Sequence, residues 1–299
     1  MATLYSQADK NIQRTWLLMI SFFIVVIGLG WAFSYVFENQ SILYVAVGFS
    51  LLMNVGSFWY SDKLALATSG AKPADEIQFQ ELHRIVENLS ITAGQTKPRV
   101  FVINDPAPNA FATGRDATHG AVAVTTGLLS MMDRPELEGV LAHELSHIKN
   151  RDTLVMTVVV VLLGFVTLVS DFFLRSMIHG GGNNGGDNRD GRFQLILIVV
   201  GFLLAIFAPL IAQLIQFAIS RRREFLADAS GALLTRYPEG LASALQKIGA
   251  YAHPMRNANH ATAHLFIGSP FGAKALKGVN KLFSTHPPVE ERVKALLNH

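Results

Sequence analysis

The chain contains no cysteine among its 299 residues. This absence excludes disulfides and thiolate metal sites, so any zinc must be held by histidine and carboxylate ligands, which favours a catalytic site over a structural finger. Charge is also scarce: charged residues make up 16% of the chain, whereas a soluble protein carries about a quarter. Half of the residues are hydrophobic. The composition therefore predicts a membrane protein.

Four long apolar runs have the length that a bilayer requires. They cover residues 15–37, 42–60, 154–174 and 193–219, and we expect each to be a transmembrane helix. The first is longer than the apolar part of a secretory signal and ends in aromatic rather than small residues, so it is predicted to be a retained anchor. A pair of buried core helices is the alternative for the last two runs, and Pro209, Gln213 and Gln216 make the fourth the weakest candidate.

Basic residues gather beside these runs, mainly on one side. They are Lys10, Arg14, Lys63, Lys149, Arg151 and residues 221–223, whereas only Arg175, Arg189 and Arg192 flank the other side. Lys and Arg next to spanning helices mark the cytoplasmic face, so the net charge of +3 indicates membrane topology and no nucleic-acid partner. We therefore expect a multi-pass protein of the plasma or inner membrane with both termini in the cytoplasm.

The remaining sequence forms two soluble parts. Residues 1–14 are a short cytoplasmic N-terminus, residues 61–153 the first part and residues 220–299 the second. The first part is predicted to contain a helix over 75–89 and strands over 99–103 and 121–126. Residues 175–192 form a glycine-rich extracytoplasmic loop, typical of a flexible linker. No strand precedes this loop and no lysine of a phosphate-binding motif follows it, which disfavours phosphate binding.

The strongest chemical motif is His143-Glu144-Leu145-Ser146-His147. Two histidines four apart on a helix project from one face, so both imidazoles can reach one metal ion, and Glu144 can reach a water bound to it. Asp133 and Glu136 predict a capping box at the start of this helix, with Pro135 in its first turn. The alternative is a helix whose two histidines only form hydrogen bonds. Several divalent metals accept such ligands, and zinc is the expected one.

A catalytic zinc usually has a third protein ligand. After the fourth apolar run, Glu224 and Asp228 lie four apart on a predicted helix. Glu224 is a candidate to complete the metal site, and Asp228 a candidate to fix the tautomer of an imidazole. The alternative is a solvated helix face that pairs these acids with residues 221–223.

These residues resemble the HtpX-type membrane zinc metalloproteases, which are relatives of the CAAX prenyl proteases. The resemblance is carried by His143–His147, by Glu224-Phe-Leu-Ala-Asp228, by Asn109-Ala-Phe-Ala-Thr-Gly114 and by Phe283-Ser-Thr-His286-Pro, and it covers nearly the whole chain. It implies a mainly α membrane protein with four transmembrane helices and a cytoplasmic, gluzincin-like α+β protease domain assembled from two chain segments. It also implies one Zn²⁺ held by His143, His147 and Glu224, with Glu144 as the base. Family members are heat-stress quality-control endopeptidases that act on damaged membrane proteins.

The resemblance gives roles to two further segments. Asn109, Ala110 and Phe111 match an edge strand that pairs with an extended substrate, which binds main chain and so tolerates many sequences; the alternative is an ordinary turn. His286 matches a histidine near the catalytic cleft, where a donor could stabilise the oxyanion; the alternative is a loop histidine that packs locally. His260 and His264 have no carboxylate between them and are expected at the surface. Arg292 is either a partner of an active-site carboxylate or solvated.

Both metal-ligand segments border apolar runs. Helical continuation at about 1.5 Å per residue keeps His147 and Glu224 within roughly 10 Å of the membrane interface, which predicts substrates that emerge from the bilayer. Charges around the motif disfavour an intramembrane protease, since a charged helix is costly at the bilayer centre. A membrane adaptor without activity has no use for Glu144, and a transporter requires polar spans. Oligomeric state is not encoded in any recognisable pattern.

Overall fold

The computed structural model describes residues 4–36, 38–162, 221–259, 262–272 and 286–298. Most of the third predicted transmembrane helix, the glycine-rich loop over 175–192 and the fourth helix over 193–219 lie outside the described residues, and so does His260. The motif helix and the segment that carries Glu224 are both described.

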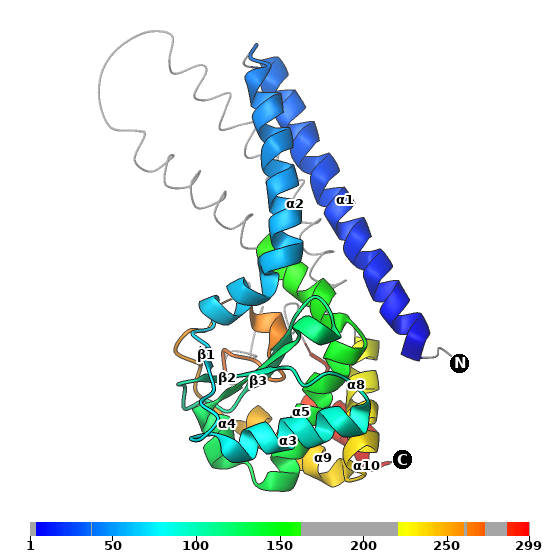
Figure 1. The fold of residues 1–299 in the computed structure, drawn as a ribbon, viewed down its shortest axis with the longest axis vertical. Helices are drawn as coiled ribbons and strands as arrows, with labels where there is room; N and C mark the ends of the chain where they lie inside the picture. The colour runs from blue at the N-terminus through cyan, green and yellow to red at the C-terminus, as the bar shows by residue number, and fades with distance from the viewer. Residues whose placement is uncertain (1–3, 37, 163–220, 260–261, 273–285, 299) are drawn as a thin grey trace.

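Two long helices form an antiparallel hairpin that rises away from the rest of the molecule (Figure 1). They are α1, Leu4–Val36, and α2, Ser41–Thr68. Both are long and apolar enough to cross a membrane. Large apolar side chains project outward from both helices and are more than half exposed, among them Trp16, Leu17, Ile24, Trp31, Leu52 and Val55. Exposed apolar surfaces of this kind mark contact with a membrane or with another protein. The α2 helix continues to Thr68, beyond the predicted end of the span at residue 60, and delivers the chain to the sheet.

A four-stranded sheet follows this hairpin. Its strands are β1 (Lys72–Pro73), β2 (Arg99–Ile103), β3 (Ala110–Thr113) and β4 (Ala121–Thr125), in the order β1-β2-β4-β3. β2 and β4 are parallel, whereas β3 pairs antiparallel with β4 and lies at an edge. The strands predicted over 99–103 and 121–126 are confirmed within one residue. β1 was not predicted.

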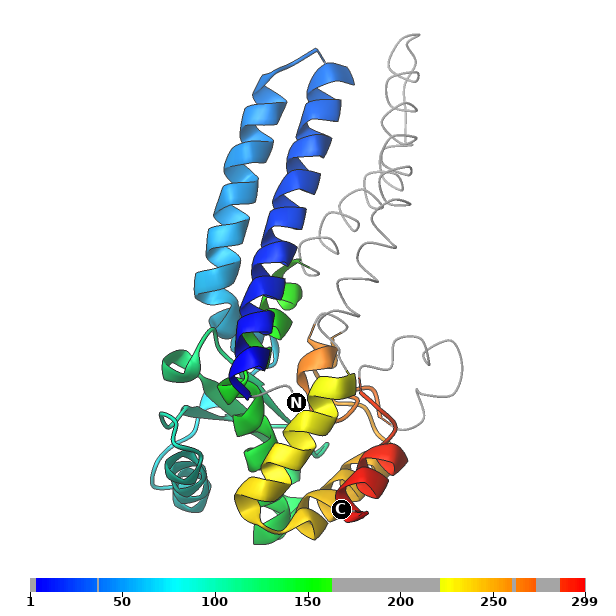
Figure 2. The same cartoon turned by 90° about the vertical axis from the view of Figure 1, so that its right-hand side faces the viewer.

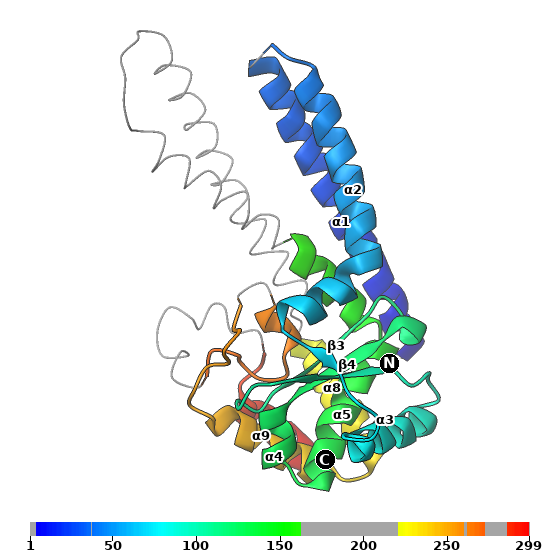
Figure 3. The same ribbon diagram turned by 60° about the vertical axis from the view of Figure 1, so that its left-hand side comes forward.

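Helices cover the sheet and supply most of the soluble core (Figure 3). They are α3 (Gln80–Ala93), α4 (Thr126–Met131), α5 (Arg134–Lys149), α8 (Arg221–Thr235), α9 (Pro238–Ala250) and α10 (Val289–Leu297), with short 3₁₀ turns at Ala117–His119 and Ala263–Leu265. The helix predicted over 75–89 starts only at Gln80, because the Asp75 carboxylate accepts hydrogen bonds from the Ile77 and Gln78 amides and closes a turn first. α5 lies at the centre and contacts β3, β4, α3, α8 and α9.

The chain turns sharply after α5. Arg151 adopts a left-handed backbone conformation, with φ of 56°, and a second helix runs from Asp152 to Leu162. Leu154, Val158 and Leu162 of this helix pack against Met19 and Phe22 of α1 in a shared apolar cluster. Figure 2 shows the start of α1 beside this part of the chain. The metal-motif helix is thereby joined to the base of the membrane hairpin.

Candidate metal centre

The α5 helix begins as the sequence predicts. The Asp133 carboxylate accepts from the Glu136 amide at 3.0 Å, and the Glu136 carboxylate accepts from the Asp133 amide at 2.9 Å, with Pro135 in the first turn. Leu137, Val140 and Leu141 then face the core. This start fixes the register of the helix, and with it the face on which both histidines lie.

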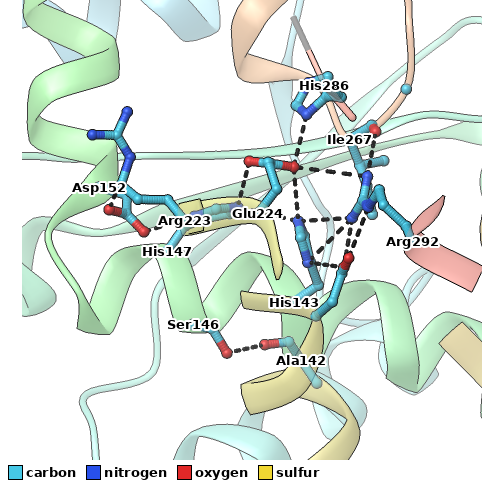
Figure 4. Close-up of polar contacts among 12 residues, drawn as sticks. Ala142, His143, Ser146, His147, Asp152, Arg223, Glu224, Ile267, His286 and Arg292 are labelled. Carbon is cyan, nitrogen blue, oxygen red and sulfur yellow. Dashed lines mark hydrogen bonds and ion pairs between the residues drawn. The ribbon is translucent and has the colours of Figure 1, made fainter. Parts of the chain in front are cut away.

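Three side chains converge at the middle of the domain (Figure 4). The Nε2 atoms of His143 and His147 lie 3.1 Å apart. Glu224 on α8 places one carboxylate oxygen 3.4 Å from His147 Nε2 and the other 3.9 Å from His143 Nε2. All three residues are buried, and their ligand atoms lie within 4.8 Å of one another. The two chain segments therefore close on each other as predicted.

A close approach of the two helices makes this convergence possible. A Cβ atom at Gly231 of α8 would lie 3.0 Å from the backbone nitrogen of His143. Any larger residue at this position would push α8 away from α5. The glycine therefore sets the separation between the histidine helix and the Glu224 helix.

Each imidazole is held from behind by a carboxylate. His143 Nδ1 lies 2.9 Å from Asp228 Oδ1, and His147 Nδ1 lies 2.9 Å from Asp152 Oδ2. A carboxylate at Nδ1 favours the tautomer with the proton on that nitrogen, which leaves the Nε2 lone pair for a metal. Asp228 therefore lies where the predicted tautomer-fixing residue must lie, and Asp152 makes the same contact on the other side.

The donor set fits zinc. Ligand atoms bound to a tetrahedral zinc at 2.0–2.1 Å lie about 3.3 Å from one another, close to the 3.1 and 3.4 Å found between His147 Nε2 and its two neighbours. The three donors are two nitrogens and one carboxylate, the combination found in many catalytic zinc sites. The two imidazoles are already oriented by the carboxylates at their other nitrogen, Nδ1.

Arg292 was predicted to be either a partner of an active-site carboxylate or solvated, and the structure shows the first. The side chain is 1% exposed. Its Nε and Nη2 donate to the two oxygens of Asp228 at 2.8 and 2.6 Å, and its Nη1 donates to the carbonyl of Ile267 at 3.3 Å. Arg292 also lies 3.7 Å from Glu224. The buried negative charge of Asp228 is thereby neutralised by a two-point contact.

The electrostatic environment separates the two histidines. Burial lowers the pKa of His143 to about 4, and the nearby positive charges of His147 and Arg292 also lower it. Asp228 opposes this shift. Burial also disfavours the charged form of His147, but the hydrogen bond to Asp152 and the charges of Glu224 and Asp152 outweigh it and raise the pKa to about 9. The pKa of Glu224 is held well below its usual value, despite burial, by His286, His147 and Arg292.

Glu144 is in an environment suited to a base. It is 2% exposed, and burial raises its pKa to about 7, with His147 opposing the shift and Glu224 adding to it. The Ala112 amide of β3 also forms a hydrogen bond with this carboxylate. A base works best when its pKa is near the operating pH, which this value satisfies.

His286 reaches the site, as predicted, and contacts a ligand directly. Its Nδ1 lies 2.7 Å from Glu224 Oε2. The predicted alternative, a loop histidine that packs locally, does not describe this position. Figure 4 shows His286 approaching Glu224 from the side opposite α5.

The outer edge of β3 is covered by the chain itself, which the sequence did not predict. The Ile267 amide donates to the Ala110 carbonyl at 2.9 Å, and Phe111 forms a bridge with Phe266. The Asn109 side chain binds both polar groups of Gly268, accepting from its amide at 3.1 Å and donating to its carbonyl at 3.0 Å. We call residues 266–268 the covering segment. This segment forms hydrogen bonds with the atoms of Asn109 and Ala110 that were predicted to bind a substrate.

Two positions differ from the prediction for physical reasons. His264 is buried, not at the surface, because its Nε2 bonds to the Met156 carbonyl at 2.9 Å. Asp152 was not predicted, because it lies beyond the end of α5, where helical spacing no longer applies. The left-handed turn at Arg151 brings its carboxylate back to His147. An acidic residue a few positions after the second histidine is the signal that could have identified it.

Known proteins are similar along the whole chain. The profile described as Peptidase family M48 matches residues 76–299. Proteins named protease HtpX homolog from Caldanaerobacter subterraneus subsp. tengcongensis and Thermoanaerobacter pseudethanolicus are 48% and 47% identical, each over 98% of this chain and 97% of the relative. A protein of the same name from Pyrococcus furiosus is 45% identical over 95% of this chain and 94% of the relative.

Among solved structures, a crystal structure of Ste24p from S. mikatae aligns with 98% of this chain and 67% of its own. The TM-score is 0.49 and the identity 18%. The family match and the identities are decisive. The chain belongs to peptidase family M48, with the HtpX proteases, and is a metalloendopeptidase.

Proposed function

We propose that the protein is a membrane-bound zinc endopeptidase that cleaves damaged or misfolded membrane proteins at the cytoplasmic face. The observation that supports this most is the buried set of His143, His147 and Glu224, in which each imidazole has a carboxylate at its far nitrogen. These three residues would hold Zn²⁺. When bound, zinc would polarise the scissile carbonyl and acidify a water molecule.

Glu144 is proposed as the general base. Its carboxylate takes a proton from the attacking water and returns it to the nitrogen of the leaving amine, so the base is regenerated in one turnover. The Ala112 amide orients the carboxylate. Asp228 and Asp152 keep the ligand imidazoles in place and touch no substrate atom.

His286 is proposed to stabilise negative charge on the reacting carbonyl oxygen. The ring lies 2.7 Å from Glu224, which places it beside the proposed metal ligands, where the scissile carbonyl would be polarised. A donor aimed at a developing oxyanion contributes through the low dielectric of a buried site.

The edge of β3 is proposed as the substrate-binding strand, with Asn109, Ala110 and Phe111 as its main contacts. The covering segment already binds this edge as an extended peptide would: the Ile267 amide meets the Ala110 carbonyl, and the Ile267 carbonyl accepts from Arg292 beside the metal ligands. A substrate strand would form the same main-chain contacts only after the covering segment has left.

The membrane location is proposed from the apolar hairpin and its basic flanks. Two helices can cross a bilayer, and the segment after α5 packs on the base of α1. The metal ligands are therefore attached to the base of the hairpin, where loops or tails of membrane proteins emerge. The four-span, multi-pass topology with both termini in the cytoplasm is proposed on the same grounds as in the sequence.

The test compares Glu144→Gln with Glu138→Gln, a matched change on the same helix at a residue that pairs with Arg134 at the surface. We expect Glu144→Gln to retain zinc, measured by elemental analysis, while cleavage of a membrane-tethered unfolded substrate falls by about a hundredfold to ten-thousandfold. Glu138→Gln should retain both. Substantial cleavage by Glu144→Gln would contradict the assigned base, and equal rates on tethered and soluble unfolded substrates would contradict the membrane role.

A further inference from the structure

The carboxylate behind His147 is bound by three different parts of the chain. Asp152 is 1% exposed. One of its oxygens contacts His147 Nδ1 at 2.9 Å; the other accepts from the Asn11 side-chain amide at 2.6 Å and lies 3.4 Å from Arg223 Nε. Asn11 belongs to α1, the first helix of the membrane hairpin. A contact therefore runs from this helix through one carboxylate to a metal ligand.

Asn11 also secures the backbone that presents Asp152. The Nδ2 atom donates to the carbonyl of Asn150 at 3.0 Å, as well as to Asp152. Between these two residues lies Arg151 in its left-handed conformation, which is unfavourable for a residue with a side chain. The amide of Asn11 thus binds both sides of the strained turn that returns Asp152 to His147.

The position of Asn11 is unusual for a helix that merely anchors a protein. Its side chain is fully buried, at 0% exposure, in the half of α1 nearest the soluble domain. Burying a primary amide is costly unless hydrogen bonds compensate it. Apolar contacts alone, such as those of Phe22 with the helix that follows Asp152, would suffice for docking.

We propose that Asn11 is a positioning residue for the zinc ligand His147. It acts through Asp152: the amide holds the carboxylate, the carboxylate holds Nδ1, and the ring presents Nε2 to the metal. The membrane helix α1 is then a component of the metal site. This inference depends on the zinc role of His147 proposed above.

The test uses full-length protein in lipid nanodiscs, loaded with zinc and then challenged with a chelator. Asn11→Leu removes the donor while keeping the number and branching of the side-chain heavy atoms, and Asn11→Asp keeps the shape while placing a carboxylate against Asp152. Loss of a partner behind a metal-bound histidine typically weakens metal binding tenfold to a hundredfold, and we expect zinc loss about tenfold faster in both variants. The visible spectrum of the cobalt-substituted protein should change as well, which a purely structural role would not cause.

Two controls on α1 separate positioning from docking. Gln13→Leu alters an exposed neighbour, and Phe22→Ala weakens apolar docking without touching Asp152. Both should lose zinc within about twofold of the wild-type rate. If Phe22→Ala releases zinc as fast as Asn11→Leu, the effect belongs to docking and the proposal is wrong.

A double variant tests the route of the effect. If Asn11 acts through Asp152, adding Asn11→Leu to Asp152→Asn should accelerate zinc loss no further, because residues in one network are not additive. Full additivity, or unchanged zinc loss in both Asn11 variants, would overturn the inference. Wild-type protein that binds no zinc would instead overturn the proposed function.

Discussion

Both imidazoles of the candidate metal site are held at Nδ1 by a carboxylate, but different groups stabilise the two carboxylates. Behind His143 lies the C-terminal support, Asp228 and Arg292, in which a buried guanidinium neutralises the carboxylate through two short hydrogen bonds. Behind His147 lies the membrane-side support, Asp152 with Asn11 and Arg223, in which the short contact comes from a neutral amide. The distance from the imidazole Nδ1 to the nearest carboxylate oxygen is 2.9 Å on both sides.

The difference shows in the charge of the imidazoles. Burial lowers the pKa of His143 to about 4, and the positive charges of His147 and Arg292 add to this shift. Arg223 lies farther from Asp152, at 3.4 Å, and the pKa of His147 is raised to about 9, because the hydrogen bond to Asp152 and the charges of Glu224 and Asp152 outweigh burial. The comparison teaches that equal distances at Nδ1 do not imply equal protonation, because burial outweighs the carboxylate at His143, whereas Asp152, Glu224 and Glu144 together outweigh burial at His147.

The largest expected effect comes from removing the cation on each side. Arg292→Leu leaves Asp228 buried without its partner, which should lower the free energy of unfolding by about 3 to 5 kcal/mol. Arg223→Leu should cost only about 1 kcal/mol, because Asp152 keeps its hydrogen bonds to Asn11 and His147. Thermal unfolding of the two variants in the same detergent makes the comparison. Equal losses of stability in the two variants would contradict the proposed difference between the two supports.

A second, somewhat smaller effect concerns pH in protein stripped of metal by a chelator. A pKa of His147 raised from 6.5 to about 9 means that the folded state prefers the protonated ring. That contribution, about 3 kcal/mol, is complete below pH 6.5 and is lost as the pH rises through 9. Unfolding measured from pH 6 to 10 should therefore show decreasing stability in this window.

The matched variants for this titration are His147→Gln and His143→Gln. The first should remove the decrease between pH 6.5 and 9. The second should retain it, because His143 has a pKa lowered to about 4 and stays neutral throughout this range. A decrease that persists in His147→Gln would assign the titration to another group.

The smallest expected effect concerns the covering segment, which is bound on the C-terminal side through the contact of Arg292 with Ile267. A Cβ atom at Gly268 would lie 2.3 Å from Ile248 Cγ2, so Gly268→Ala should displace this segment from Asn109. Loss of two hydrogen bonds at about 1 kcal/mol each would raise peptide cleavage by up to about thirtyfold. Gly56→Ala, where a Cβ atom meets nothing within 4 Å, is the control. Unchanged or reduced cleavage by folded Gly268→Ala would contradict displacement of the segment by substrate.

Local patterns in the sequence predicted the centre of the site well. The capping box at Asp133 and the four-residue spacing of His143 and His147 are properties of one helix, so they follow from the chain itself. The pair Glu224 and Asp228 likewise shares one helix face, and the structure brings both to the histidines.

Contacts between distant segments were beyond such patterns. Arg292 meets Asp228 from 64 positions away, and Asn11 meets Asp152 from 141 positions away. The burial of His264 and the pairing of the covering segment with β3 likewise depend on tertiary packing, which periodicity does not encode. The sequence thus predicted His143, His147, Glu224 and Asp228 and offered Arg292 as one of two alternatives, whereas Asp152 and Asn11 became apparent only in the tertiary structure.

The order of the residues along the chain has a consequence for synthesis. His143 and His147 leave the ribosome long before Glu224, and Arg292 is among the last eight residues of the 299. A nascent chain that has not reached these residues therefore lacks a proposed metal ligand and the cation that neutralises Asp228, so we expect it to be unable to hydrolyse its neighbours while it is still being inserted. We therefore expect proteolytic competence only after the segment that carries Arg292 has been made.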